Sequence, residues 1–333
     1  MKIGTSLRFF FPSGPQTLGI YQSIAKTAPP GAFLERPMGS FDPVEQAENL
    51  IVLAAAARKA NLWCLLVGDN HSAPPIFGRL FQPVPTVARL SAETGTMPIG
   101  MVLLAPFYHP LLLAEQIATI SAFVDAPIII TFASGGSERA FDAFGYSMRS
   151  RGVRTEEIVA AVRALLAAET VTATGRSFDL VNATISPLPR HPVQILIAGT
   201  NETTVERAGR IGDGWLTAQN ATDAELARHL DVYRRTAERH GRVPLPVLRR
   251  DIHLAASDGE ARAHIDPILA EGYRGLDYER LLVGSPDTIV KRLRTYESMG
   301  FNHVLVRHIT GDHDAIVASF GLLGDVSMTV GQR

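Results

Sequence analysis

Four short segments carry most of the polar and glycine residues from which a catalytic site could be built. Each segment follows a run of apolar or β-branched residues of the kind that forms a strand. The segments are Gly68–Ser72, Ala105–Pro110, Ala133–Gly136 and Gly199–Glu202. If the preceding runs are the parallel strands of a barrel, the segments meet at the end of the barrel where such enzymes carry their active sites. We therefore expect one site assembled from all four.

His71 is the candidate catalytic residue of this site. An imidazole titrates near neutral pH, so it can give a proton to a reacting group or take one from it. A loop histidine that only shapes the pocket is an equally supported interpretation. His109 precedes Pro110 at a predicted helix start, and there we expect capping or packing.

Two further sets of charged residues are candidates for binding. Arg249, Asp251 and His253 share one face of a predicted strand, where we expect a structural network between Arg249 and Asp251 and place His253 nearest to substrate. Arg307 and His308 lie near the end of the last predicted strand. They could bind an anionic group of the substrate or form a salt bridge, and the sequence supports the two roles equally.

Glycine-containing turns and a pair of arginines are candidates for holding a phosphate or a planar cofactor. The pair Gly135 and Gly136 allows close approach of the backbone, although a tight turn would also use it. Ala198–Asn201 leads from a strand into a helix whose N–H groups can bind phosphate. Arg151 and Arg154 are possible phosphate ligands, with neighbouring glutamates as alternative partners.

Composition and absent motifs exclude several classes of function. A net charge of −1 and a pI near 6.8 argue against nucleic acid or a membrane surface as the main partner. The lone Cys64 excludes an intrachain disulfide and multi-cysteine metal sites. Rossmann, P-loop, HExxH and GxSxG motifs are absent. We see no secretion signal, and apolar runs such as Ile51–Ala57 are too short to cross a bilayer. A cytoplasmic protein is expected.

The segments that must position these residues alternate between predicted strands and predicted helices along the whole chain. This alternation predicts a fold of the α/β class, a single (β/α)8 TIM barrel. We expect one domain over residues 1–333. The predicted strands are Lys2–Phe9, Leu62–Val67, Ile99–Leu104, Ile128–Phe132, Val193–Ala198, Gly214–Ala218, Pro246–Leu254 and His303–Ile309. The predicted helices are Pro43–Ala60, Pro85–Thr94, Pro110–Ala122, Arg154–Glu169, Thr203–Ile211, Asp223–His240, Asp258–Ala270 and Pro286–Gly300.

Three segments interrupt the alternation. Residues 11–41 are rich in Pro, Gly and Ser, and we expect them to form an insertion over the barrel mouth that carries substrate contacts. Glu169–Ile185 is predicted to be a hairpin. Gly272–Gly284 is predicted to be a mobile flap.

Several stretches of the chain resemble one family. These are IGMVLLAPFYHPLLLAEQIATI (99–120), FGYSMRSRGVRTEEIVAAVRALLAAETVTATGRSFDL (144–180), the following SPLP, VQILIAGTNETTVERAGRIGDGWL (193–216) and GSPDTIVKRLRTYESMGFNHVLV (284–306). In order and spacing they are similar to the luciferase-like monooxygenases and their F420-dependent relatives. The sequence differs from the family pattern at Asp125-Ala126-Pro127 and after the second strand, where a single histidine, His71, replaces a pair.

The resemblance implies a flavin or deazaflavin ring across the barrel mouth against Ala105, and a non-prolyl cis peptide near Val102 and Leu103. The cofactor contacts predicted from the resemblance and from the glycine turns are Val102, Leu103, Ala105, Ser134, Gly135, Gly136, Ala198, Gly199, Thr200 and Asn201.

The implied activity is that of a monooxygenase, which uses reduced FMN from a separate flavin reductase, together with oxygen, on a small-molecule substrate. Hydride transfer with F420 is a close alternative, and a homodimer is expected. A metal-dependent hydrolase and a catalytically silent flavin-binding homologue are the remaining alternatives. The hydrolase would use histidines among His71, His109, His253, His303 and His308 together with Asp69 or Asp251.

Overall fold

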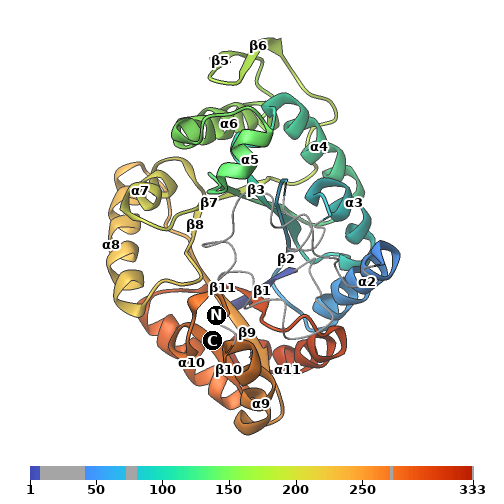
Figure 1. Cartoon of the computed structure of the whole chain (residues 1–333). Helices are drawn as coiled ribbons and strands as arrows, with labels where there is room; N and C mark the ends of the chain where they lie inside the picture. Colours follow the sequence, from blue (N-terminus) through green and yellow to red (C-terminus); the bar gives the residue numbers. More distant parts are fainter. Residues whose placement is uncertain (8–41, 73–80, 271–272, 332–333) are drawn as a thin grey trace.

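The computed structural model describes residues 1–7, 42–72, 81–270 and 273–331. Its centre is a closed barrel of eight parallel strands surrounded by helices (Figure 1). The predicted TIM barrel is therefore confirmed. The barrel strands are β1 (Lys2–Leu7), β2 (Leu65–Gly68), β3 (Ile99–Leu104), β4 (Ile128–Ala133), β7 (Gln194–Ala198), β8 (Gly214–Leu216), β9 (Pro246–Leu254) and β11 (His303–His308).

The barrel closes because β9 pairs with both β8 and β11. The lower part of β9 pairs with β8 at Trp215 and Leu216. Its upper part pairs on the same edge with an additional strand, β10 (Leu281–Gly284), which lies opposite residues 251–254. The predicted flap at Gly272–Gly284 is thus wrong for Leu281–Gly284, because the upper half of β9 offers these residues a ladder of backbone hydrogen bonds.

Helices follow the barrel strands, as predicted. They are α2 (Pro43–Lys59), α3 (Pro83–Thr94), α4 (Pro110–Phe123), α5 (Glu138–Ala143), α6 (Arg151–Leu166), α7 (Glu202–Ile211), α8 (Asp223–Arg239), α9 (Asp258–Ala270), α10 (Pro286–Met299) and α11 (His313–Gly331). Local signals explain their limits. Ser285 caps α10 by accepting from the N–H of Thr288, and the helix ends at Gly300.

The predicted hairpin at Glu169–Ile185 is also present. It consists of the antiparallel strands β5 (Val171–Gly175) and β6 (Phe178–Ala183), which lie outside the barrel against α6 (Figure 1). The insertion expected at 11–41 lies outside the described residues.

The C-terminal helix α11 was not predicted, because its sequence contains three glycines and several small polar residues. Among the described helices it alone is long and apolar enough to cross a membrane by length and composition. Its residues Ile316, Phe320, Leu323 and Val326 are buried, and α11 packs on α2 and α10. These contacts are those of a helix that covers a barrel.

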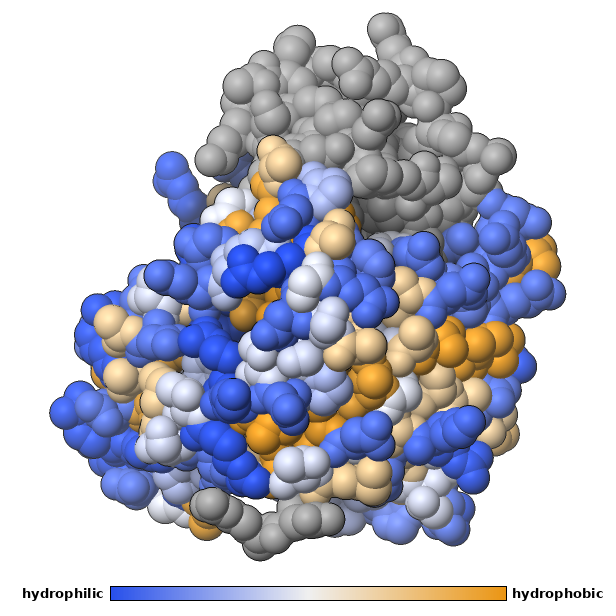
Figure 2. All heavy atoms as spheres, turned by 90° about the horizontal axis from the view of Figure 1, so that it is seen from below, coloured by the Kyte–Doolittle hydropathy of each residue, from blue (hydrophilic) through white to orange (hydrophobic). Residues whose placement is uncertain are grey.

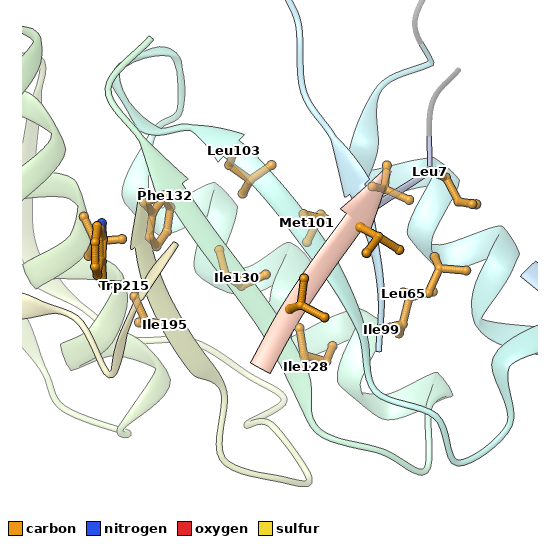
Figure 3. Packing of buried hydrophobic residues seen from close by; sticks show 14 of the residues in the cluster. Leu7, Leu65, Ile99, Met101, Leu103, Ile128, Ile130, Phe132, Ile195 and Trp215 are labelled. Carbon is orange, nitrogen blue, oxygen red and sulfur yellow. The ribbon is translucent and has the colours of Figure 1, made fainter. Parts of the chain in front are cut away.

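The strands bury side chains on both faces. Alternate residues of β3 and β4, such as Met101, Leu103 and Ile130, point outward into the layer between strands and helices (Figure 3). The inner face carries a second apolar cluster with Leu66, Val102 and Ile129 among its members. This inner cluster closes the barrel interior below the mouth, so the polar residues beyond it sit on a packed floor.

The surface carries some exposed apolar side chains among charged ones. Leu112, Phe123 and Val181 are examples. On the face shown in Figure 2, apolar residues form several patches bordered by hydrophilic ones. Scattered apolar side chains of this kind are ordinary for a protein surface, and the homodimer stays a prediction.

Candidate active site

Asp69 joins the ends of β2 and β3. Its side chain is fully buried, and its Oδ2 accepts three hydrogen bonds. The donors are the backbone N–H of Leu104 at 2.9 Å, the hydroxyl of Tyr108 at 3.0 Å and Nε2 of His71 at 3.1 Å. A carboxylate buried in this way is held in place by all three donors.

The contact with Asp69 selects the tautomer of the neutral His71 ring. A carboxylate can only accept, so Nε2 of His71 carries the proton and donates it. Nδ1 of the neutral ring is then left with its lone pair and can act as a base. Burial and the neighbouring Asp69 raise the pKa of Tyr108, so the tyrosine remains a neutral donor to the same oxygen.

Aromatic rings surround His71. Its side chain is 10% exposed, and it makes edge contacts with Phe107, Tyr108 and Phe144 at centroid distances of 5.1, 5.7 and 5.1 Å. These rings exclude water from most of the imidazole.

Of the three residues at the end of β3 that were predicted to contact a cofactor, only Val102 lies on the inner face of the barrel, in the inner cluster. Ala105 begins the short 3-10 helix Ala105–Phe107 after the strand, and its side chain is fully buried in the cluster between strands and helices. Leu103 points outward into the core (Figure 3), which leaves only its backbone at the mouth.

The predicted cis peptide near Val102 and Leu103 is wrong. Among the described residues the cis bond is Ser186–Pro187, and the bonds from Met101 to Leu104 are trans. β3 keeps an unbroken parallel register with β4 over six residue pairs, from Ile99 to Leu104. This regular ladder needs the ordinary trans geometry.

The turn after β4 leaves room above its backbone. Gly135 has φ +71°, a conformation that favours glycine, and a Cβ placed on Gly136 would meet nothing within 4 Å. Ser134 accepts a hydrogen bond from Thr155 of α6 at 3.0 Å. This turn is fixed to α6 yet open above, which suits the close approach of a planar ligand.

The turn after β7 is more closely packed. A Cβ on Gly199 would lie 2.9 Å from Nε1 of Trp215, whose N–H already donates to the carbonyl of Gly199. The backbone N–H groups of Thr200 and Asn201 donate to Oγ1 of Thr204. Packing and the helix cap therefore explain Gly199, Thr200 and Asn201, and a phosphate contact of Ala198–Asn201 stays a prediction.

Asp251 of β9 forms its ion pair with β11. Nε and Nη2 of Arg307 donate to its two carboxylate oxygens at 3.1 and 2.7 Å. The hydroxyl of Tyr273 donates to Oδ2 at 2.7 Å, and Arg274 lies 3.6 Å away. Asp251 thus lies in a charged network that includes Arg307 of β11, and the network expected between Asp251 and Arg249 stays a prediction.

The other histidines are dispersed. His253 contacts His264 of α9 at 3.1 Å, His308 contacts Ser319 of α11 at 3.0 Å, and His303 packs against Trp63. His109 precedes α4 without a side-chain cap, as a packing role would require, and its ring lies 6.3 Å from that of Phe178. In the described part of the chain, no group of three or more His, Cys, Asp or Glu is placed to hold a metal ion.

Two residues of the site were predicted only as members of their segments, without the roles that the structure gives them beside His71. Asp69 is in the Gly68–Ser72 segment, and its position immediately after a strand was the signal. Tyr108 is in the Ala105–Pro110 segment, but nothing in the sequence shows that its hydroxyl reaches Asp69. Contacts of this kind between two strand ends depend on strand register.

Comparison with known proteins defines the class to which this barrel and site belong. The family model described as luciferase-like monooxygenase matches residues 31–280. The chain belongs to this family, and the resemblance seen in the sequence is confirmed. Its homologues are oxidoreductases that depend on F420 or on FMN.

Three similar proteins illustrate the range of the family. The F420-dependent glucose-6-phosphate dehydrogenase of Beutenbergia cavernae is 26% identical over 308 residues, covering 82% of this chain and 90% of that protein. The monooxygenase RslO1 of Streptomyces bottropensis has a TM-score of 0.78 and 21% identity, with 98% of both chains covered. The oxygenating component of 3,6-diketocamphane monooxygenase of Pseudomonas putida, solved with FMN, has a TM-score of 0.71 and 16% identity, with 88% and 94% covered.

Proposed function

We propose that this chain transfers a hydride between a small organic substrate and the deazaflavin F420, with His71 moving the accompanying proton. The observation that carries the proposal is the Asp69–His71 pair, which the ring of Phe107 connects to the turn after β4: Phe107 contacts His71 at 5.1 Å, and a Cβ on Gly135 would lie 3.7 Å from Phe107. Oxidation of an alcohol needs a base for the hydroxyl proton, and Nδ1 of His71 provides one. The relative of Beutenbergia cavernae, named as F420-dependent, supports this choice of cofactor. It reverses the preference for FMN that the sequence suggested.

Residues of the site fit a planar ring with polar edges. The backbone at Gly136 is open. Two buried polar atoms, Oδ1 of Asp69 and Oγ1 of Thr131, have no hydrogen-bond partner within the described residues. Thr131 follows Ile129 by two positions on β4 and so shares its inward face. In this proposal Val102, Ser134 and Gly136, together with the backbone at Ala105, would hold the ring.

The chain's own residues then have distinct tasks. F420, when bound, supplies a two-electron acceptor or donor of hydride. Nδ1 of His71 takes the hydroxyl proton of the substrate, and the Asp69 carboxylate keeps the proton on Nε2 and stabilises the imidazolium that forms. Phe107, Tyr108 and Phe144 keep water from the ring of His71, which strengthens its interaction with Asp69.

Oxygenation of the substrate with reduced FMN is the second candidate. It is favoured by the similarity of the whole fold to monooxygenases, and it uses the same residues with His71 as the proton-transfer group. This candidate alone needs a separate flavin reductase. A homodimer and a cytoplasmic location are not needed by either candidate and stay predictions.

Anaerobic titration of the purified protein with F420, FMN and reduced FMN, followed by admission of oxygen, separates the candidates. We expect F420 to bind, and a panel of alcohols to include one that reduces it without oxygen uptake. Oxygen uptake with reduced FMN and formation of an oxygenated product would overturn the proposal in favour of the second candidate. If neither cofactor binds, the chain is a silent homologue.

A further inference from the structure

The loop that carries His71 is attached to the barrel a second time, at Ser72. Nε of Arg139 donates a hydrogen bond to the backbone carbonyl of Ser72 at 2.9 Å. Arg139 is the second residue of α5, the helix that follows β4, and lies 67 positions from Ser72 in the sequence. The bond therefore connects the loop after β2 to the helix after β4.

The backbone at Ser72 has a conformation that this bond helps to stabilise. Ser72 has φ +50°, in the left-handed region that residues other than glycine rarely adopt. The chain thus turns directly after His71. A guanidinium is a charged donor, and its hydrogen bonds are stronger than those between neutral groups. Arg139 therefore supports a turn that Ser72 alone would disfavour.

Helix α5 also contacts the imidazole through aromatic rings. Phe141 of α5 is 1% exposed, and its ring lies 4.8 Å from that of Phe107. Phe144, directly after the helix, lies 4.7 Å from Phe107 and 5.1 Å from His71. The buried Phe141 anchors α5 beside the site. The α5 segment then supports the ring of His71 through Phe144 and its backbone through Arg139.

The direction of Nδ1 of His71 depends on both ends of the side chain. Asp69 holds Nε2, which is at the far end of the ring from the main chain. Nδ1 lies nearer the main chain, so its direction also depends on where the backbone of His71 is held. The bond between Arg139 and the carbonyl of Ser72 holds the backbone immediately after it. A misplacement of about 1 Å can lower a rate by about a hundredfold.

We propose that Arg139 is a positioning residue, which acts through the carbonyl of Ser72 to keep the imidazole of His71 in its orientation toward Asp69. The importance of Arg139 for turnover rests on the proposed function, in which His71 moves a proton. Its effect on the orientation of the ring does not. Because the acceptor is a backbone oxygen, the effect depends on a hydrogen-bond donor at position 139.

Two variants of Arg139 and one matched control test this inference. Arg139→Met keeps a long side chain but removes its donors, whereas Arg139→Lys keeps a positive charge and a donor. Arg239→Met is the control, because Arg239 is an exposed arginine in the last turn of α8. Arg139 is also exposed, so all three variants should fold, and urea unfolding checks this.

The first measurement is nitrogen NMR of the histidine rings, without cofactor or substrate. The signals of His71 are identified by their loss in His71→Gln. We expect the wild type, Arg239→Met and Arg139→Lys to show one tautomer of His71, with the proton on Nε2. Arg139→Met should show a mixture of the two tautomers, because the ring is no longer held toward Asp69. Unchanged signals of His71 in Arg139→Met would overturn the inference.

The second measurement is turnover with F420 and an alcohol. In Arg139→Met we expect kcat to fall by about three- to tenfold, as for the loss of one hydrogen bond, with KM and the Kd of F420 close to the wild-type values. Arg139→Lys should restore most of kcat. A fall that the lysine variant does not restore, or a change confined to KM, would overturn the inference. If the wild type shows no turnover but the NMR result is as expected, the proposed function fails and the positioning of His71 by Arg139 stands.

Discussion

Oδ2 of Asp69 lies 3.1 Å from Nε2 of His71, and the same oxygen binds the backbone N–H of Leu104. The imidazole is therefore positioned relative to the backbone of β3, not only to its own loop. Because β3 is a regular strand in the barrel, the orientation of His71 is tied to the hydrogen-bonded barrel sheet. This is the support that a proton-transfer residue needs.

Replacement Asp69→Asn should lower kcat by about a hundredfold or more, the usual contribution of a positioned acid or base. An amide can donate to the histidine ring and so favour the wrong tautomer. Cofactor affinity should change far less than kcat. The control is Asp125→Asn, because Asp125 is exposed and pairs with Arg190 at the surface. Unchanged turnover in Asp69→Asn would remove His71 and Asp69 from the mechanism.

Gly136→Ala and Gly199→Ala should affect different properties of the protein. The methyl group on Gly136 meets nothing within 4 Å, whereas on Gly199 it lies 2.9 Å from Trp215. We expect Gly136→Ala to weaken cofactor binding with little change in stability, and Gly199→Ala to lower stability by about 1–3 kcal/mol. Urea unfolding and cofactor titration of both variants provide the test. A stable Gly199→Ala protein with impaired cofactor binding would restore the role predicted from sequence.

The barrel was predictable because its signal is repeated along the chain. Apolar runs such as Ile99–Leu104 and Pro246–Leu254 are bounded by turn residues, and their limits agree with the strands. By contrast, β10 is a strand because the upper half of β9 offers it a partner. Helix α11 is stable because the barrel and its neighbours bury one face of a glycine-containing sequence. Tertiary contacts of this kind override local propensity.

The candidate site was predictable as a location but not as a set of bonds. The rule that barrel sites lie after the strands selected the segment containing His71. It did not show that Asp69 binds Tyr108, or that Asp251 pairs with Arg307 of β11. Partners 39 and 56 residues apart in sequence are brought together only by strand register.

Replacement Asp251→Ala should lower stability by about 3–5 kcal/mol, because it removes the buried carboxylate from its ion pair with Arg307. Asp251 is fully buried, and the Arg307 side chain is 12% exposed. Asp277→Ala is the control, because Asp277 is half exposed and pairs with Arg280. An exposed ion pair contributes about 0–1 kcal/mol to the free energy of unfolding. Similar losses in the two variants, measured by urea unfolding, would contradict a buried ion pair in the barrel.

Stability should fall as the pH is lowered from 7.5 to 5. Burial lowers the pKa of His253 to about 4, that of His303 to about 4 and that of His308 to about 3, from an ordinary value of 6.5. Charged neighbours of these histidines either increase or reduce the downward shift of their pKa values. His264 lowers the pKa of His253 and Asp312 raises it, while Lys2 and the N-terminus lower that of His303.

The sign follows from proton uptake. Below pH 6.5 the unfolded chain binds protons at these histidines while the folded chain does not, so the stability present at higher pH is lost as the pH falls toward the folded values. For the fully buried His308 the loss by pH 5 is about 2 kcal/mol.

His308→Gln should therefore flatten the pH dependence of urea unfolding by about that amount. Ser319→Ala removes the hydrogen-bond partner of His308 but leaves the histidine, so it should lower stability at every pH and keep the slope. An unchanged slope in His308→Gln would show that His308 does not titrate between the folded and unfolded states in this range.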